Sequence, residues 1–566
     1  MAAGDEQVSA APAPENLLED WEPRPFVLAA LLACGGLGLH FLFDGSDPQP
    51  LAGAGAAFIF FAALAAAFAL DPRNWKSVAV FALGLGAVMA GIAWHVLRFE
   101  EAYAGQHFAF AAGVFASVIA LPLFQAGFHR TRLNTDYKLT HFHVWTDAIS
   151  GAGALAFTGL SWLMLFLLDG LLGLVGINLI EDLTREGWFG WMWSGAAFGT
   201  ALGVLRNNLK IISSLQNVVL IVLSLLAVPL ALALVVFLVA LLASGGQALW
   251  DATDSATPVL LACAVGCFVL TNAIMRDDDV ATSRSRILRG VAMVLAAGVL
   301  PLSVFAAVSM GIRVHQHGLT PERIWALICI AVAVAYGIAY AVGLAQGRVS
   351  GWATYLRRAN LNLASATGIL ALILALPLWD FGAISARNQV ARLDAGRVSV
   401  EAFDYSALRW DFGDAGRQAL ARLGEREGEV GRLARAAAAQ TMRVWRGLET
   451  PTRGDVAARL RVQPDSEELR AEVLDFLTTE SWRCAEACIA LDLGRNAEGR
   501  REIALVEGYN FERFVLGGPD GRADPIYPLA QDGQLPPFTR DAEVELREET
   551  RRAIYVNGRR VGVPVD

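Results

Sequence analysis

Eleven long apolar stretches constrain this chain more than any other feature of its sequence. A hydrocarbon core about 30 Å thick needs roughly 20 apolar residues of helix, and a helix satisfies its own backbone hydrogen bonds in lipid. The stretches are residues 26–43, 51–70, 77–97, 108–128, 148–168, 188–205, 216–242, 257–275, 287–311, 324–344 and 361–379. Only 18% of the residues are charged, against about 25% in soluble domains. The sequence therefore predicts a polytopic α-helical membrane bundle of about 11 transmembrane helices.

The charge is unevenly distributed and divides the chain into three regions. Residues 1–25 are rich in Ala, Pro, Asp and Glu, a composition typical of a disordered tail. Residues 26–380 form the predicted transmembrane domain, and 381–566 a soluble domain long enough for its own core. A net charge of −9 gives no indication of nucleic-acid binding. The expected partners are membrane lipids and a protein partner in the envelope.

The basic residues between the stretches indicate an orientation. Fourteen follow even-numbered stretches: Arg73, Lys76, Arg130, Arg132, Lys138, Arg206, Lys210, Arg276, Arg284, Arg286, Arg289, Arg348, Arg357 and Arg358. Four follow odd-numbered ones: Arg98, Arg185, Arg313 and Arg323. Because loops rich in Lys and Arg stay in the cytoplasm, we predict a cytoplasmic N-terminus and a periplasmic C-terminal domain.

The C-terminal domain is predicted to be α+β. Its first half indicates helices, including roughly 416–446 and 466–478, and alternating segments follow: CIALDL, REIALVEG, FERFVLGG and RAIYV-NG-RRVGV. Asn557-Gly558 suits a two-residue hairpin turn, so we expect a small antiparallel sheet. Cys484 and Cys488 are four residues apart. A disulfide between them needs a non-helical backbone, and whether they are bridged stays open at this point.

Small and polar residues within the stretches indicate helix packing. Gly195, Gly199 and Gly203 form two overlapping G-x-x-x-G patterns, a spacing that lets another backbone approach closely. Polar side chains such as Asn272 are expected to make interhelical hydrogen bonds.

Three segments carry a resemblance to a known family. They are LWDATDSATPVLLACAVGCFVLTNAIMRDDD, GIRVHQHGLTPERIWAL and ISARNQVARLDAGRVSVEAFDYSALRWDFGDAGRQAL. Together they resemble the bacterial family called domain of unknown function 4153, over residues from about 130 to 420. GLTPER and ARNQVARLDAGRVSVEAFDY are the most specific parts, and the family usually has Tyr where this chain has His317. The resemblance implies a bacterial inner-membrane protein and no particular activity.

Several residues are candidates for ligand binding. Thr320-Pro321-Glu322 predicts a helix start, and Arg313, His317 and Arg323 lie around it. The two arginines could bind an anion, although arginines at a membrane boundary usually extend toward lipid headgroups. Asp169 ends an apolar run, and an acid at membrane depth is a functional candidate. Asp44 lies in the first outer loop.

One cluster could hold a divalent metal. His141, His143 and Asp147 combine imidazole and carboxylate ligands. On a helix, however, His143 and Asp147 share a face that His141 does not, and interfacial His is the ordinary interpretation. No cofactor is predicted, and the C-terminal domain has no phosphate loop, nucleophile elbow or zinc spacing.

Three hypotheses of function follow. The first is a non-enzymatic envelope or complex-forming protein that positions a periplasmic domain. The second is a transporter or flippase of a small or lipid-linked solute, which requires a cavity or lateral groove reaching mid-membrane. The third is a membrane glycosyltransferase-like enzyme that uses Asp44 or Asp169, although the first outer loop, DGSDPQP, is short for a catalytic site.

Overall fold

The computed structural model describes residues 21–43, 49–99, 101–244, 256–277, 285–441, 443, 453–479, 483–484, 488–496, 499–507, 510–517, 524–526, 552–556 and 559–565. The chain forms two compact units, Met1–Thr441 and Met442–Asp566. The predicted fold class is confirmed: a polytopic helical bundle, accompanied by a C-terminal α+β region.

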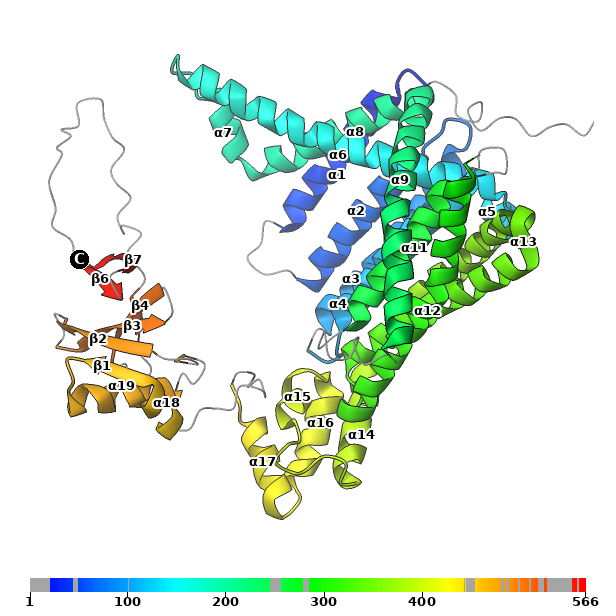
Figure 1. Ribbon diagram of the computed structural model, residues 1–566. Coiled ribbons are helices and arrows are strands. Elements are labelled where there is room, and N and C mark those ends of the chain that lie inside the picture. The colour runs from blue at the N-terminus through cyan, green and yellow to red at the C-terminus, as the bar shows by residue number, and fades with distance from the viewer. Residues whose placement is uncertain are drawn as a thin grey trace, which may run out of the picture. The chain divides into compact units, whose positions relative to one another are not determined.

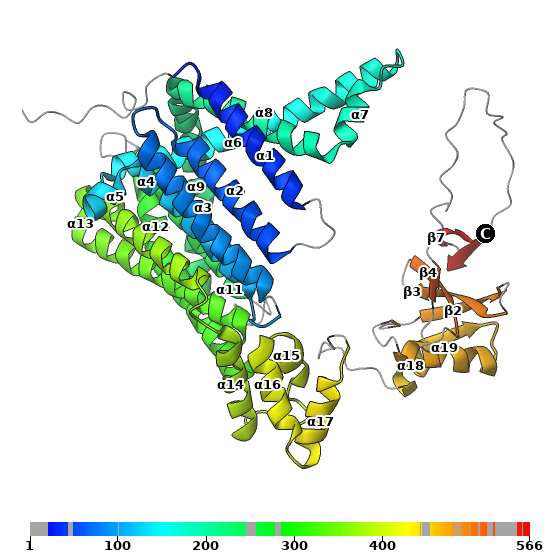
Figure 2. The same cartoon turned by 180° about the vertical axis from the view of Figure 1, so that it is seen from behind.

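The first unit consists of helices only, within the described residues. They are α1 (Arg24–Phe43), α2 (Pro50–Ala69), α3 (Trp75–Arg98), α4 (Gln106–Gln125), α5 (Phe128–Thr131), η2 (Arg132–Asn134), α6 (Tyr137–Gly173), α7 (Leu179–Arg185), α8 (Gly187–Asn207), α9 (Leu209–Ala243), α11 (Ala256–Met275), α12 (Arg286–His317), α13 (Pro321–Ala375), α14 (Phe381–Asp394), α15 (Tyr405–Trp410), α16 (Gly413–Gly424) and α17 (Gly428–Ala438). In the described part of the chain, ten helical segments are long and apolar enough to cross a membrane. In both views α2 lies between α1 and α3 (Figures 1 and 2).

The predicted sixth stretch corresponds to α8, which is not among those ten segments. Its glycines and tryptophans lower its mean hydropathy, yet it packs along the whole of α1. A Cβ on Gly195 or Gly199 would collide with the carbonyl oxygen of Leu32 or Leu28, and one on Gly203 would lie 2.5 Å from the Cα of Pro25. The glycines therefore let two helix backbones touch, which is how small residues hold membrane helices together.

Helix α13 folds back on itself. Its two apolar parts are Pro321–Gly347 and Gly351–Ala375, and the Tyr340 hydroxyl donates to Asn360 Oδ1 at 2.8 Å. Twenty residues of straight helix would separate these groups by about 30 Å, so the chain reverses between the two parts. The predicted tenth and eleventh stretches are thus two antiparallel passes.

The four helices α14 to α17 form a compact group that we call the collar. Its core contains Leu393, Phe403, Tyr405, Leu408, Phe412, Leu420 and Leu423. The sequence predicted one helix over roughly 416–446, and this prediction is wrong in detail. The helix ends at Gly424 and a new one begins at Gly428, whose φ of +80° interrupts a regular helix.

The second unit contains α18 (Arg453–Arg459), α19 (Glu467–Thr479) and a five-stranded sheet in the order β1-β2-β3-β4-β5. The strands are β1 (Leu460–Gln463), β2 (Cys488–Arg495), β3 (Arg501–Glu507), β4 (Asn510–Val515) and β5 (Asp524–Ile526). The sequence predicted an antiparallel sheet, but β1 and β2 are parallel, since α19 provides the crossover between them. The predicted hairpin is confirmed as β6 (Arg552–Val556) paired antiparallel with β7 (Arg559–Val565).

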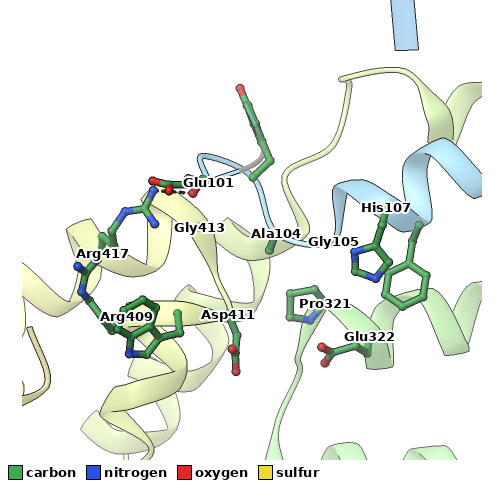
Figure 3. A pocket seen from close by; sticks show the side chains of 13 residues that line it. Glu101, Ala104, Gly105, His107, Pro321, Glu322, Arg409, Asp411, Gly413 and Arg417 are labelled. Atoms are coloured by element: carbon green, nitrogen blue, oxygen red, sulfur yellow. Dashed lines mark hydrogen bonds between the residues drawn. The ribbon is translucent and has the colours of Figure 1, made fainter. Parts of the chain in front are cut away.

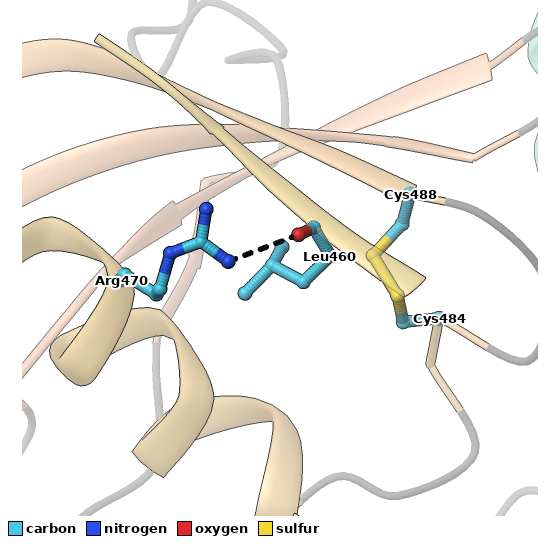
Figure 4. Close-up of a disulfide and its surroundings, with 4 residues drawn as sticks. All are labelled: Leu460, Arg470, Cys484 and Cys488. Carbon is cyan, nitrogen blue, oxygen red and sulfur yellow. Dashed lines mark hydrogen bonds between the residues drawn. A yellow bond between two sulfur atoms is a disulfide. The ribbon is translucent and has the colours of Figure 1, made fainter. Parts of the chain in front are cut away.

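Cys484 and Cys488 form a disulfide (Figure 4). Cys484 has a φ of +57°, and Cys488 begins β2. Neither cysteine lies in a helix, which agrees with the condition that the four-residue spacing imposes on a disulfide.

We expect Gly199→Leu to destabilise the bundle by about 1–3 kcal/mol, because the new side chain must push α1 away from α8. Gly159→Leu on α6 is the matched control, since a Cβ there meets no atom within 4 Å. Thermal unfolding of the detergent-solubilised protein measures both. Equal unfolding midpoints for the two variants would contradict the close α1–α8 packing.

Candidate functional site

A charged pocket of about 400 Å³ lies where the collar meets the bundle. We call it the collar pocket. Three parts of the chain line it: the segment that leads into α4, the start of α13, and the segment from α15 to α16. Its lining residues are Glu101, Tyr103, Ala104, Gly105, His107, Phe108, Pro321, Glu322, Arg409, Trp410, Asp411, Gly413 and Arg417.

The collar is joined to the segment before α4 by main-chain contacts. The amide of Asp414 donates to the carbonyl of Ala102 at 2.8 Å, and the Arg417 guanidinium donates to the carbonyl of Glu101. Gly413 has a φ of +62°, and a Cβ on it would collide with the same Ala102 carbonyl. A glycine at this position lets α16 begin against the α3–α4 connection.

The start of α13 forms the facing wall. The Thr320 side chain caps the helix by accepting from the Arg323 amide at 3.4 Å, and Pro321 occupies the first turn. The Trp325 ring packs edge-on against Phe381 of α14, with 5.3 Å between ring centroids. The predicted helix start thus holds Glu322 at the pocket and fixes α14 beside it.

The pocket is lined by charges of both signs, and Glu101 lies beside Arg417 (Figure 3). Figure 3 shows Arg409 and Arg417 on one side, His107 and Glu322 on the other, and Asp411 between them. Arg417 is also held by Asp414 at 2.6 Å, and the Arg409 guanidinium stacks on the Trp410 ring at 4.8 Å. These contacts orient the two guanidinium groups before any ligand binds.

Side chains of α14 attach the collar to the end of α12. Arg392 donates to the carbonyls of His315 and Gln316 at 2.8 and 2.6 Å. Gln389 donates to the carbonyls of His317 and Leu319 at 2.9 and 3.0 Å.

Asn388 and Gly318 complete this attachment. The Asn388 side chain accepts from the Leu319 amide at 2.9 Å. Gly318 has a φ of +75°, and a Cβ there would lie 2.7 Å from atoms of both Arg392 and Gln389. The segments GLTPER and ARNQVARLDAGRVSVEAFDY, which are the most specific parts of the family resemblance, therefore contact each other directly.

The predicted ligand-binding residues lie beside the collar pocket or away from it. Arg323 donates to the carbonyl of Gly318 at 2.7 Å, so it braces the turn before α13. Arg313 is half-buried and the His317 side chain is exposed, and neither lines the pocket. Asp169 is partly exposed on α6, and Asp44 lies outside the described residues.

The predicted metal ligands do not converge. Asp147 accepts from Gln125 at 3.3 Å, whereas the His141 ring packs against Tyr137 and the His143 ring against Phe142. Across the described part of the chain, no three His, Cys, Asp or Glu side chains are placed to hold a metal ion. The reason is helix geometry, because positions 141 and 143 lie on different faces of α6.

The sequence alone did not identify four charged or polar residues that line the pocket: Glu101, His107, Arg409 and Arg417. These residues come from regions more than 300 positions apart, and nothing local marks them as one site. One signal was available: Trp410 follows Arg409 inside the segment that carries the family resemblance.

The fold and the pocket define a multi-pass α-helical membrane protein with a helical collar fixed to one end of its bundle. A family model described as Domain of unknown function (DUF4153) matches residues 56–423. This is more than half of the chain, so the protein belongs to that family. The predicted resemblance is confirmed and extends toward the N-terminus beyond residue 130. No curated protein and no solved structure matches the chain.

Replacing Gly318 with Ala is expected to loosen the collar, because the added methyl group displaces Gln389 and Arg392. Faster hydrogen exchange in α14 would report the loss of these contacts. Gly428→Ala is the control: that residue also has a positive φ, but a Cβ on it meets no atom within 4 Å. Unchanged exchange of α14 in Gly318→Ala would show that the side-chain contacts do not hold the collar.

The ion pair between Asp394 and Arg426 gives a pH prediction. Arg426 donates to Asp394 at 2.6 Å and lowers the pKa of that carboxyl below its ordinary value of 3.8. A lowered pKa in the folded state stabilises the fold above pH about 4, and this stabilisation is lost as pH falls through the lowered pKa. Both side chains are nearly half exposed, so the effect is below about 1 kcal/mol.

Asp394→Asn should therefore lower the unfolding midpoint slightly at pH 7, and the difference should become smaller at pH 3. Thermal scans at both pH values, each at low and high salt, provide the measurement. A difference of the same size at pH 3 as at pH 7 would show that the carboxylate charge is not its cause.

Proposed function

We propose that this protein is a non-enzymatic binding protein of the bacterial inner membrane, which holds its collar and C-terminal domain at the periplasmic face. The collar pocket is its ligand site. The observation that carries the proposal is the attachment of α14 to residues 315–319, because it makes the pocket a rigid part of the bundle. Binding sites require this kind of support, since ordering a loose site reduces affinity.

Two observations support the periplasmic placement of the collar. The charge asymmetry of the loops favours a periplasmic position for this end of the bundle. The disulfide of Cys484 and Cys488 lies in the unit that follows the collar, and disulfides persist in oxidising compartments such as the periplasm.

The chemistry of the pocket favours a small zwitterionic ligand. Oriented guanidinium groups bind carboxylate or phosphate, and Glu322 on the facing wall is suited to an ammonium group. A volume of about 400 Å³ accommodates a molecule of the size of an amino acid or a phosphoethanolamine group. Binding rather than turnover is proposed because Arg417, the Arg409–Trp410 stack and the capped start of α13 are built to hold charges in place.

A second candidate, a lipid transporter or flippase, is favoured by one observation. An apolar groove runs along α3, α4 and the second pass of α13 at the other end of the bundle. A transporter or flippase requires a cavity or lateral groove of this kind within the membrane. Lipid translocation assays in proteoliposomes distinguish the two candidates, since a binding protein leaves the translocation rate unchanged.

The proposed ligand class can be tested on the full-length protein in detergent. A panel of free amino acids and phosphoethanolamine is expected to contain at least one compound that raises the unfolding midpoint in a dose-dependent way. Arg409→Gln and Glu322→Gln should each reduce the affinity for that compound about tenfold or more. A tenfold change corresponds to about 1.4 kcal/mol of binding free energy.

The control is Glu425→Gln, an exposed carboxylate of the collar outside the pocket. Isothermal titration calorimetry supplies the affinities. A panel without effect, or a ligand bound equally by all three variants, would refute the zwitterion site.

A further inference from the structure

A second concave surface lies within the membrane-spanning part of the bundle. It is an apolar groove of about 440 Å³ between α3, α4 and the second pass of α13, and we call it the lateral groove. On α3 it extends from Val80 to Met89, on α4 and the residues after it from Gly113 to His129, and on α13 from Ser365 to Leu372. Val80 and Ile369 at its sides are 74% and 58% exposed, so the groove opens on the surface that faces lipid.

The lining offers hydrocarbon contacts and satisfied hydroxyl groups. Ser117 donates to the carbonyl of Gly113 and Ser365 to that of Leu361, both at 2.8 Å within their own helices. Gly84 has no side chain, and a Cβ on it would meet no atom within 4 Å. Apart from His129 at one end, such a lining gives water few hydrogen-bonding partners, and within a membrane its natural occupant is an acyl chain.

The length of the groove fits one leaflet. Nine residues of helix separate Val80 from Met89, a rise of about 14 Å. Half of a hydrocarbon core about 30 Å thick is about 15 Å. The groove begins near the end of the bundle opposite the collar, and it therefore reaches about the middle of the membrane.

Basic side chains mark that end of the groove. Lys76 precedes Val80 by one helical turn on α3 and is exposed. His129 lines the groove and stacks on Phe124, with 5.0 Å between ring centroids. The exposed Arg130 follows, with its Nε 3.1 Å from the His129 ring. Three basic groups thus lie at the depth of lipid headgroups.

We propose that the lateral groove binds one anionic glycerophospholipid from the leaflet opposite the collar. One acyl chain lies along Gly84 between α3 and α4, and the phosphate lies near Lys76 and Arg130. Transfer of a chain from bulk lipid into the groove gains no hydrophobic free energy, because lipid tails are equally apolar. Dispersion contacts with the concave lining and the pairing of phosphate with the basic groups supply the affinity.

This inference does not depend on the proposed function, because the lateral groove and the collar pocket share no lining residue. The test uses variants in the groove alone. Gly84→Leu places a side chain in the lateral groove. The backbone can accept it, because a Cβ at this position would meet no atom within 4 Å. Gly91→Leu is the matched control: Gly91 is exposed on the same helix, a Cβ there is equally unhindered, and it lies outside the groove.

The full-length protein is extracted in mild detergent, delipidated stepwise and examined by native mass spectrometry. We expect one phospholipid to remain on the wild type and on Gly91→Leu, and its occupancy to fall at least fivefold in Gly84→Leu. Unfolding midpoints of the two variants, measured in parallel, show that both remain folded. Equal lipid retention in Gly84→Leu and Gly91→Leu would identify the lipid as non-specific and overturn the proposal, as would a wild type that retains none.

The headgroup is tested in nanodiscs that contain phosphatidylglycerol and phosphatidylethanolamine in equal parts. The wild type is expected to retain phosphatidylglycerol at least threefold over phosphatidylethanolamine. The double variant Lys76→Gln, Arg130→Gln should lose that preference. An unchanged preference in the double variant would exclude these basic groups as the phosphate site.

Discussion

The structure depends on a set of hydrogen bonds between side chains of α14 and the main chain that leads from α12 into α13. Asn388, Gln389 and Arg392 bind backbone groups of residues 315–319. Because these hydrogen bonds go to the main chain of residues 315–319, they depend on the backbone conformation of that segment more than on its side chains. Gly318 supplies that path, since a φ of +75° and the lack of a Cβ bring the turn close enough to Gln389 and Arg392.

This attachment determines what the collar can do. Helices α14 to α17 have a core of their own, yet they meet the bundle through main-chain contacts at Ala102 and through the Trp325–Phe381 pair. A pocket formed between two rigid parts keeps its charged walls at a fixed separation. Charge complementarity at a fixed distance selects a ligand by the spacing of its own charges, which is the basis for expecting a zwitterion.

The membrane architecture was predictable because its cause is local in the sequence. Each stretch must be long and apolar to cross the membrane, and Gly195, Gly199 and Gly203 show their common face through their spacing alone. Asn272 was expected to bond between helices, and it donates to the Tyr340 hydroxyl at 2.9 Å. The strands of the second unit were predicted from alternation, but the parallel pairing of β1 with β2 was not, since alternation gives no information on strand direction.

The collar pocket could not be predicted, because the chain reversal that assembles it leaves no mark at the pocket residues themselves. Glu101 and Arg417 become neighbours only after the passes of α13 and the turns of the collar are in place. His141, His143 and Asp147 are close in sequence, but α6 directs them to different neighbours, and within the described residues they form no group that could hold a metal ion. In a helix, residues three or four positions apart lie on the same face, whereas residues two positions apart, such as His141 and His143, point in different directions and cannot easily bind one ligand.

The collar pocket and the lateral groove share two helices, α4 and α13. The loop before α4 forms one side of the pocket, and the later turns of α4 form the floor of the groove; α13 contributes its first turn to the pocket and its second pass to the groove. A lipid in the groove therefore packs against the helices that position Glu322 and His107. Gly84 leaves an open position in the groove, since a Cβ on it would meet no atom within 4 Å, and the proposed acyl chain covers it. Gly113 instead packs against Ile92 and Met89 of α3, so the close approach of α3 to α4 is a property of the protein itself.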